Sequence, residues 1–194
     1  DPLRRKVVFR IMHRDGGSGN FPASVRMRVR CAKIVHLRIV PNPMKHPRSD
    51  GIDPAARSRS RRRALQAVYA WQMSQTPVDK VLEQFSHEQD MEVADLAYFE
   101  ELVRGVIAGH KELDQALSAY VDRPMEQIDP IERAVLRIAA LELRDRLDVP
   151  YRVILNEAIE TAKRFGSDHG HTYVNGVLDQ AAGQWRAAEI NARR

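Results

Sequence analysis

Residues Ala56 to Gln72 read ARSRSRRRALQAVYAWQ, and the character of this stretch changes halfway along. Its first half is cationic, with five arginines within seven positions: Arg57, Arg59, Arg61, Arg62 and Arg63. Its second half places apolar side chains at helical spacing: Leu65, Val68, Tyr69 and Trp71. The pattern predicts a cationic arm that contacts nucleic acid and continues into an amphipathic helix, which anchors the arm to an all-helical domain.

The chain after Gln72 repeats this helical spacing. Apolar side chains recur at helical intervals in six further segments: 78–85, 96–109, 113–120, 131–146, 151–165 and 173–185. Asp53-Pro54 and Asp129-Pro130 are helix-start signals, because aspartate caps the first turn and proline presets its backbone. The segment 131–146 is apolar over much of its surface, which predicts the central helix. The predicted fold class is therefore all-α, a compact bundle of about seven helices.

Four parts of the chain differ in composition. Residues 1–43 begin with Asp1, contain scattered arginines and a glycine-rich stretch, and precede a Met44 typical of a protein start. We therefore predict that residues 1–43 are a non-native or disordered leader. Residues 44–56 are polar and are predicted to be a flexible N-terminal arm. Residues 57–187 form the predicted helical domain that binds nucleic acid, and residues 188–194 form a C-terminal tail.

Charge is distributed unevenly, although the net charge is only +5. Residues 1–63 hold 17 Lys and Arg against 4 Asp and Glu, whereas residues 64–194 hold 14 against 22. A basic end on an acidic body indicates a protein whose basic end meets phosphates. The alternative is a tail that binds polyanions without specificity.

Composition excludes several classes of protein. No segment approaches the roughly 20 apolar residues that span a bilayer, so we predict no membrane association. The single cysteine, Cys31, excludes an internal disulfide and any multi-cysteine zinc site. One cysteine also suits a reducing cytosol, which predicts a cytoplasmic protein.

The sequence lacks the common motifs of enzymes: a phosphate-binding glycine loop, GxSxG and HExxH. Asp168, His169 and His171 resemble part of a metal site, but a solvated helix entry is the favoured interpretation without a second cluster. We therefore predict no enzymatic activity, no cofactor and no metal. Tyr69 and Tyr173 are candidates for stacking on unpaired bases, and periodicity favours the alternative that they pack in the core.

Five motifs in order carry a resemblance to a known family: ALQAVYAWQ at 64–72, ERAVLRIA at 132–139, DVPY at 148–151, VILNEAIETAKRFG at 153–166 and YVNGVLD at 173–179. Together they resemble the NusB family of bacterial transcription antitermination factors over roughly residues 57–185. The resemblance implies an all-helical domain of two packed helical subdomains. It also implies a non-enzymatic factor that binds single-stranded boxA RNA in nascent ribosomal transcripts with NusE, a ribosomal small-subunit protein. The bound pair helps to assemble an antitermination complex on RNA polymerase.

The resemblance further implies two groups of site residues. The RNA surface comprises the five arginines of the arm and a second group at a loop and helix start: Asp168, His169 and Tyr173. The NusE-facing surface comprises Tyr69 and Glu132. Family members carry an acidic residue where His169 stands in this chain. A histidine there implies an RNA affinity that differs from theirs and varies with pH.

Two alternative functions fit the same motifs. A NusB-like domain also begins certain ribosomal RNA cytosine methyltransferases, so the chain is alternatively a truncated enzyme of that kind. In the other alternative, the region of Tyr69 and Glu132 mediates self-association, and the protein is a homodimer. The mass of the particle in solution, with and without NusE, separates the homodimer from the antitermination factor.

Overall fold

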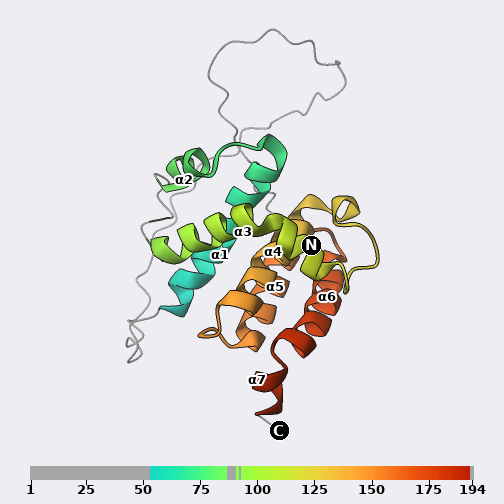
Figure 1. Ribbon diagram of the computed structural model, residues 1–194. Coiled ribbons are helices and arrows are strands. Elements are labelled where there is room, and N and C mark those ends of the chain that lie inside the picture. The colour runs from blue at the N-terminus through green and yellow to red at the C-terminus, as the bar shows by residue number, and fades with distance from the viewer. Residues whose placement is uncertain (1–52, 87–90, 92, 193–194) are drawn as a thin grey trace, which may run out of the picture. The chain divides into compact units, whose positions relative to one another are not determined.

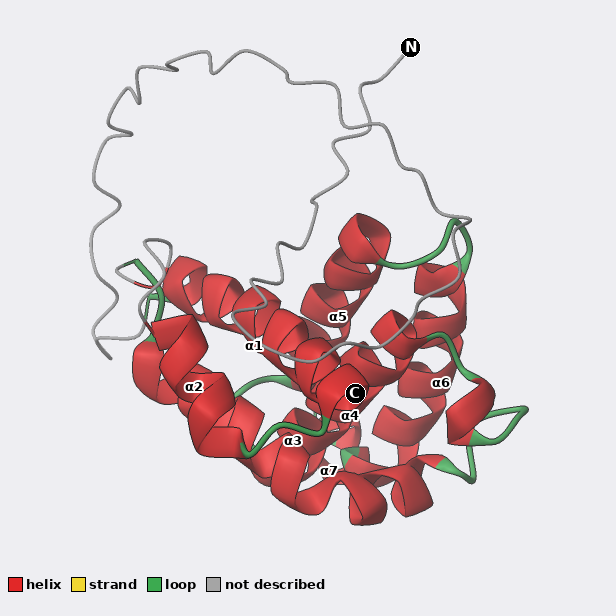
Figure 2. Cartoon of the chain, turned by 90° about the horizontal axis from the view of Figure 1, so that it is seen from above, coloured by secondary structure: helices red, strands yellow, loops and turns green. Residues whose placement is uncertain are grey.

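The computed structural model describes residues 53–86, 91 and 93–192 (Figure 1). The predicted leader at 1–43 and most of the predicted arm at 44–56 lie outside the described residues. The helices are α1 (Pro54–Ser74), α2 (Val78–Ser86), α3 (Leu96–Leu117), a short 3-10 helix η2 (Met125–Gln127), α4 (Pro130–Asp145), α5 (Tyr151–Phe165), α6 (Gly170–Trp185) and α7 (Ala187–Asn191). These described residues contain no strand, which confirms the all-α prediction (Figure 2).

Aspartate side chains determine where three of the helices begin. Each accepts a hydrogen bond from a backbone N–H of the first turn: Asp53 at α1, Asp95 at α3 and Asp129 at α4. Such a bond satisfies one of the four N–H groups that a helix start leaves without an internal partner. Both predicted Asp-Pro signals, at 53–54 and at 129–130, are thus confirmed as helix starts.

Helix α4 is the centre of the bundle and packs against α1, α3, α5 and α6 (Figure 2). Ten of its residues are buried, in agreement with the prediction of a central helix. On one side of α4, α1 packs against α3, with α2 beside both. On the other side, α5 packs against α6. This division corresponds to the two predicted helical subdomains.

Three element boundaries differ from the sequence-based predictions. A helix end was predicted near Gly109, but α3 continues to Leu117. The reason is that Val106, Leu113 and Leu117 are all buried, and this burial outweighs the cost of about 1 kcal/mol for a glycine inside a helix. The predicted arm at 44–56 extends too far, because α1 begins at Pro54, where the Asp53-Pro54 signal placed its start. Helix α7 occupies most of the predicted C-terminal tail.

Arg186, between α6 and α7, closes the C-terminal end of α4. Its Nε donates to the carbonyl of Leu143 at 2.7 Å, and its Nη2 donates to the carbonyls of Arg146, Glu142 and Val149 at 2.6, 3.2 and 3.3 Å. The last carbonyls of a helix have no partner within it, and they favour a nearby cation. Arg186 is only 4% exposed, so it fastens the end of α6 to the central helix.

Candidate nucleic-acid interface

The first half of α1 carries the five arginines that were predicted to bind RNA. Four of them are half-buried, and each donates a hydrogen bond: Arg57 to Asp148 at 3.3 Å, Arg59 to the carbonyl of Val93 at 2.6 Å, Arg62 to Ser58 at 3.0 Å and Arg63 to Gln66 at 2.7 Å. A guanidinium group has five N–H donors. Arg59, Arg62 and Arg63 are three or four residues apart, so α1 holds these three groups in a row on one side, whereas Arg57 lies one turn before Arg61 on another side.

Arg62 also lies near a cation of another helix. Burial and the positive charge of Arg164 on α5 lower the pKa of Arg62, although the carboxylate of Glu157 partly offsets them. Two guanidinium groups that repel each other make a favourable place for an anion. The arginine row on α1 therefore extends toward α5, which the sequence alone did not indicate.

Arg61 differs from its neighbours because it belongs to the core. It is 6% exposed and donates to both carboxylate oxygens of Glu142, at 2.7 and 3.0 Å, and to the hydroxyl of Tyr98 at 2.9 Å. Tyr98 in turn donates to Glu142. Burial acts to lower the pKa of Arg61, but the hydrogen bond and charge of Glu142 raise it. The prediction that Arg61 contacts RNA is therefore corrected: Arg61 forms a buried ion pair between α1 and α4.

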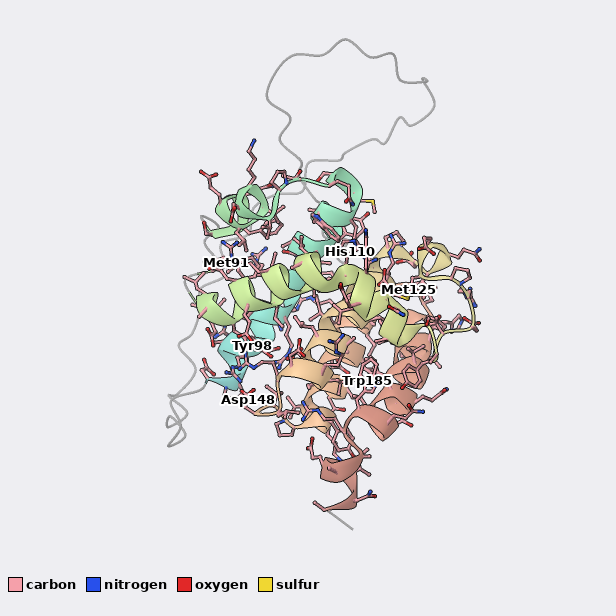
Figure 3. All side chains as sticks on the ribbon, in the orientation of Figure 1. Met91, Tyr98, His110, Met125, Asp148 and Trp185 are labelled. Atoms are coloured by element: carbon pink, nitrogen blue, oxygen red, sulfur yellow. The ribbon has the colours of Figure 1, made fainter. Side chains whose placement is uncertain are left out.

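Arginines surround one aromatic ring, that of Tyr98, which lies with Asp148 near the start of α1 (Figure 3). The guanidinium carbons of Arg57, Arg146 and Arg61 lie 4.5, 4.8 and 5.2 Å from the centre of the Tyr98 ring. Asp148 accepts hydrogen bonds from both Arg57 and Arg146. Cations favour the face of an aromatic ring, and a carboxylate between two of them reduces their mutual repulsion. This cluster orients the arginine row that follows it.

A second candidate site is a pocket at the start of α6, called here the α6 pocket. Its lining comes from three parts of the chain: Arg123, Ile128, Asp129, Glu132, Ser167, His169, Gly170 and Tyr173. The pocket brings together residues that the sequence assigned to two different surfaces. His169 and Tyr173 were predicted to contact RNA, whereas Glu132 was predicted to face NusE.

Glu132 fastens the start of α6 to α4. Its side chain is 7% exposed, and its Oε1 accepts a hydrogen bond from the Ser167 hydroxyl at 2.5 Å. A Cβ atom added to Gly170 would lie 2.0 Å from this oxygen, so any larger residue there would displace the Glu132 carboxylate. No side chain of the residue before α6 caps this helix. The carboxylate of Glu132 instead brings negative charge to its positive end.

Tyr173 forms a small network with two residues that sequence reasoning missed. Its hydroxyl donates to Asp122 at 3.2 Å, and Arg123 donates to both oxygens of Asp122, at 2.9 and 2.8 Å. The guanidinium carbon of Arg123 lies 5.5 Å from the centre of the Tyr173 ring. The hydrogen bond from Arg123, aided by that from Tyr173, lowers the pKa of Asp122 to about 2. Burial, followed by the bond to Asp122, raises the pKa of Tyr173.

The remaining predicted site residues lie on α1 and in the loop before α6. Tyr69 is half-buried and follows Arg62 by two helical turns, which places both on one face of α1. Met73, one turn further, is 53% exposed on the same face. Asp168 is exposed in the α5–α6 loop, beside His169.

The arginine row and the α6 pocket lie at different positions along α4. Arg61 pairs with Glu142, whereas the pocket contains Glu132. Ten residues of helix separate these two glutamates, which corresponds to about 15 Å. The arginine row and the α6 pocket are therefore two separate regions of the molecule.

Two further properties follow from the described residues. Among them, no three His, Cys, Asp or Glu side chains are grouped in a way that could hold a metal ion. None of the helices in this part of the chain has the length and apolar character needed to cross a membrane.

The chain is similar to known proteins in both sequence and structure. The sequence model described as the NusB family matches residues 58–183. Over 148 residues, the chain is 67% identical to the transcription antitermination protein NusB of Xanthomonas axonopodis pv. citri and to that of Xanthomonas oryzae pv. oryzae. These alignments cover 76% of this chain, 93% of the first relative and 95% of the second.

Two solved structures are similar in fold. T. maritima NusB aligns with a TM-score of 0.61 and 28% identity, over 66% of this chain and 91% of that chain. A chain from the crystal structure of antitermination factors NusB and NusE in complex with double-stranded RNA aligns with a TM-score of 0.58 and 18% identity. The second alignment covers 70% of this chain and 99% of that chain, and at this identity it demonstrates the shared fold alone.

Proposed function

Because the chain belongs to the NusB family, we propose that it is a transcription antitermination factor that binds RNA together with a NusE-type partner. The observation that carries the proposal is its high identity to relatives named transcription antitermination proteins, over nearly their whole length. A match of that extent leaves no room in those relatives for a catalytic methyltransferase domain. The antitermination function is therefore favoured over the truncated enzyme.

In the proposed function, the protein acts by binding and not by catalysis. It contacts a single-stranded boxA-type segment of the nascent ribosomal transcript, joins NusE there, and contributes to a complex that lets RNA polymerase resist termination. This work takes place in the cytoplasm and needs no cofactor. A solved complex of related factors contains double-stranded RNA, so the strandedness of the RNA belongs in the test.

The RNA surface is proposed to have two parts. Arg59, Arg62 and Arg63 on α1, with Arg57 behind them, contact phosphates through guanidinium donors that never lose their charge. The α6 pocket, with His169 and Tyr173, contacts bases, since aromatic rings stack on unpaired bases. Arg61 has no part in this surface because its donors are directed to Glu142 and Tyr98.

The partner surface is proposed to include the face of α1 that carries Tyr69. Exposed Met73 on this face supplies apolar area that a protein partner can bury. A homodimer through the same face is the competing interpretation. The two interpretations predict different effects of NusE on the mass of the particle. If this face binds NusE, NusE adds its mass to a monomer. If the face forms a homodimer, NusE displaces the second copy of the chain.

The central experiment measures binding of fluorescent boxA-type RNA to the chain, with and without NusE, by anisotropy over a series of salt concentrations. We expect tight binding that needs both proteins, that exceeds binding of a scrambled RNA, and that is stronger for the single strand than for a duplex. Equal binding of every RNA would mean that the arginine row binds RNA without sequence specificity, through its charge alone. No effect of NusE would instead favour the homodimer.

A matched pair of variants tests the arginine row. The variant in which Arg59, Arg62 and Arg63 become alanine should weaken RNA binding and flatten its salt dependence. The logarithmic slope should fall by about 2, since each phosphate contact on a single strand contributes about 0.7. The control changes three exposed arginines elsewhere, Arg104, Arg144 and Arg152, to alanine. Equal slopes for the two variants would remove the row from the RNA site.

A further inference from the structure

The α6 pocket combines flat walls with hydrogen-bond acceptors, and we propose that it is a subsite for one unpaired guanine base of the RNA. This inference rests on the proposed RNA-binding function and adds a base preference to it. The acceptors are carboxylates of Glu132 and Asp129, and the walls include the ring of Tyr173, with Arg123 stacked over it, and the buried Ile128.

The acceptor atoms come from two carboxylates that each use one oxygen internally. Oε1 of Glu132 accepts the Ser167 hydroxyl, and Oδ1 of Asp129 accepts the N–H of Ile131. Among the described residues, no hydrogen bond engages the second oxygen of either group. Glu132 is 93% buried by the surrounding protein, since only 7% of it is exposed, and yet it lines the pocket. A buried carboxylate with a free oxygen favours a ligand that donates hydrogen bonds.

The sign of these charges selects the part of a nucleotide that enters. Carboxylates repel phosphate, so the backbone of the RNA is excluded from the pocket and directed toward the arginines. An ionised carboxylate only accepts hydrogen bonds. The entering group must therefore be a donor, and unpaired bases present donors on their Watson–Crick edges.

Guanine matches this requirement best among the four bases. Its Watson–Crick edge presents two adjacent donors, the N1–H and the N2 amino group. Adenine and cytosine each place an acceptor nitrogen beside a single amino group, and uracil has one N–H between two carbonyl acceptors. Those acceptors would face the carboxylate oxygens without a proton between them. A lining that offers acceptors therefore favours guanine over the other bases, by the same logic as bidentate base recognition.

A cationic side chain of a protein partner is the competing occupant, and the lining argues against it. Arg123 already places a guanidinium group at the Tyr173 ring, 5.5 Å from its centre, so a cation of this chain already occupies that position. A lysine also needs no flat wall, whereas a base buries both faces by stacking. The position of His169 and Tyr173 in the predicted RNA surface agrees with a base.

The test uses fluorescein-labelled nonamers with four uridines on each side of a central guanosine, inosine, adenosine, cytidine or uridine. Binding of each to the full chain with NusE is measured by anisotropy. We expect guanosine to bind about tenfold or more tightly than uridine, with inosine between them because it lacks the N2 amino group. Equal binding of all five nonamers would overturn the subsite and leave RNA binding itself intact. If neither these nonamers nor boxA-type RNA bind, the proposed function fails as well.

Two variants assign the preference to the pocket. Glu132→Gln should abolish the discrimination between guanosine and uridine. Asp129→Asn should reduce it in part, and asparagine caps a helix as well as aspartate does, so α4 stays formed. The control is Glu126→Gln, which removes the same charge from an exposed residue of η2 outside the pocket.

The remaining outcomes contradict the proposal. If Glu132→Gln weakens the binding of all five nonamers equally, Glu132 only positions the start of α6 and does not select the base. If Glu132→Gln loses NusE binding but keeps the preference for guanosine, the pocket binds the protein partner and not a base. Thermal melting of each variant confirms that a change in preference occurs in a folded protein.

Discussion

A single arginine in a run of five can have a role unlike that of its neighbours, and Arg61 is the example here. The sequence places it in the middle of a cationic segment, in which every arginine is an equally good candidate for binding phosphate. Its actual partners lie 81 and 37 residues away, at Glu142 and Tyr98. Local spacing carries no information about partners at such separations, so the sequence could identify the run but not the member that belongs to the core.

The energetics of Arg61 give the first prediction. Arg61→Ala leaves Glu142 buried and charged without its partner, and breaking a buried pair in this way costs about 3 to 5 kcal/mol. Arg62→Ala, one position along and half-buried, should cost less than about 1 kcal/mol. Urea denaturation followed by circular dichroism measures both. Equal losses for the two variants would mean that the ion pair adds nothing to the free energy of unfolding.

At the scale of elements, the start of α6 depends on a glycine. Gly170→Ala places a methyl group against the Glu132 carboxylate, and such overpacking costs about 1 to 3 kcal/mol. Gly183→Ala provides the control in the same helix, because nothing lies within 4 Å of its added methyl group. This second change should be neutral or stabilise by up to about 1 kcal/mol. Melting temperatures compare the two, and a loss at Gly183 equal to that at Gly170 would contradict the contact.

The cluster that holds the start of α1 predicts a dependence on pH. The hydrogen bond from Arg146, opposed by burial and aided by the Arg146 charge, holds the pKa of Asp148 well below its usual range. A lowered pKa in the folded state contributes stability above the unfolded value near 3.9, and this contribution is lost as pH falls through the folded value.

Asp148→Asn should therefore lower the melting temperature at pH 7 and have a smaller effect at pH 3. The effect at pH 7 should be below about 1 kcal/mol, because the side chain is 46% exposed and solvent screens the pair. Melting curves of both proteins at the two pH values provide the measurement. If the difference in melting temperature between the two proteins is the same at both pH values, the effect of the substitution comes from packing and not from charge.

Helix positions were predictable from the sequence where strong signals coincide, as at Asp53-Pro54 and Asp129-Pro130. They were not predictable where burial overrides a local signal. Gly109 reads as a helix end, yet α3 continues because residues on both sides of it face the core. Helix α7 has five residues, none of them buried. Its sequence therefore lacks the regular spacing of apolar residues that would predict a helix.

At the scale of the whole molecule, the sequence predicted the fold but not the grouping of the site. The all-α bundle around a central α4 follows from apolar spacing, which reports on burial directly. The α6 pocket instead joins the residues before α4, the first turn of α4 and the start of α6. Arg123 lies 50 residues before Tyr173, and no motif connects them. Only the packing of α6 on α4 could reveal that Glu132 and His169 share one pocket.

The uneven charge of the chain leads to a prediction about specificity. Residues 1–43 contain ten Lys and Arg against two Asp and Glu, so residues 44–194 alone carry a net charge of −3. Nonspecific RNA binding is almost entirely electrostatic. Deleting residues 1–43 should therefore weaken binding to scrambled RNA more than binding to boxA-type RNA. Anisotropy with both RNAs tests this, and an unchanged ratio of affinities would show that the segment does not contribute.

The contact of Arg186 with the end of α4 has a consequence for biosynthesis. Arg186 is translated 40 residues after Arg146, whose carbonyl it binds. At 5 to 20 residues per second, this delay is about 2 to 8 s. Until Arg186 has been synthesised, the carbonyls at the end of α4 lack the partner that they have in the folded protein. The contact that closes the end of the central helix therefore forms only after α5 and α6 have been synthesised.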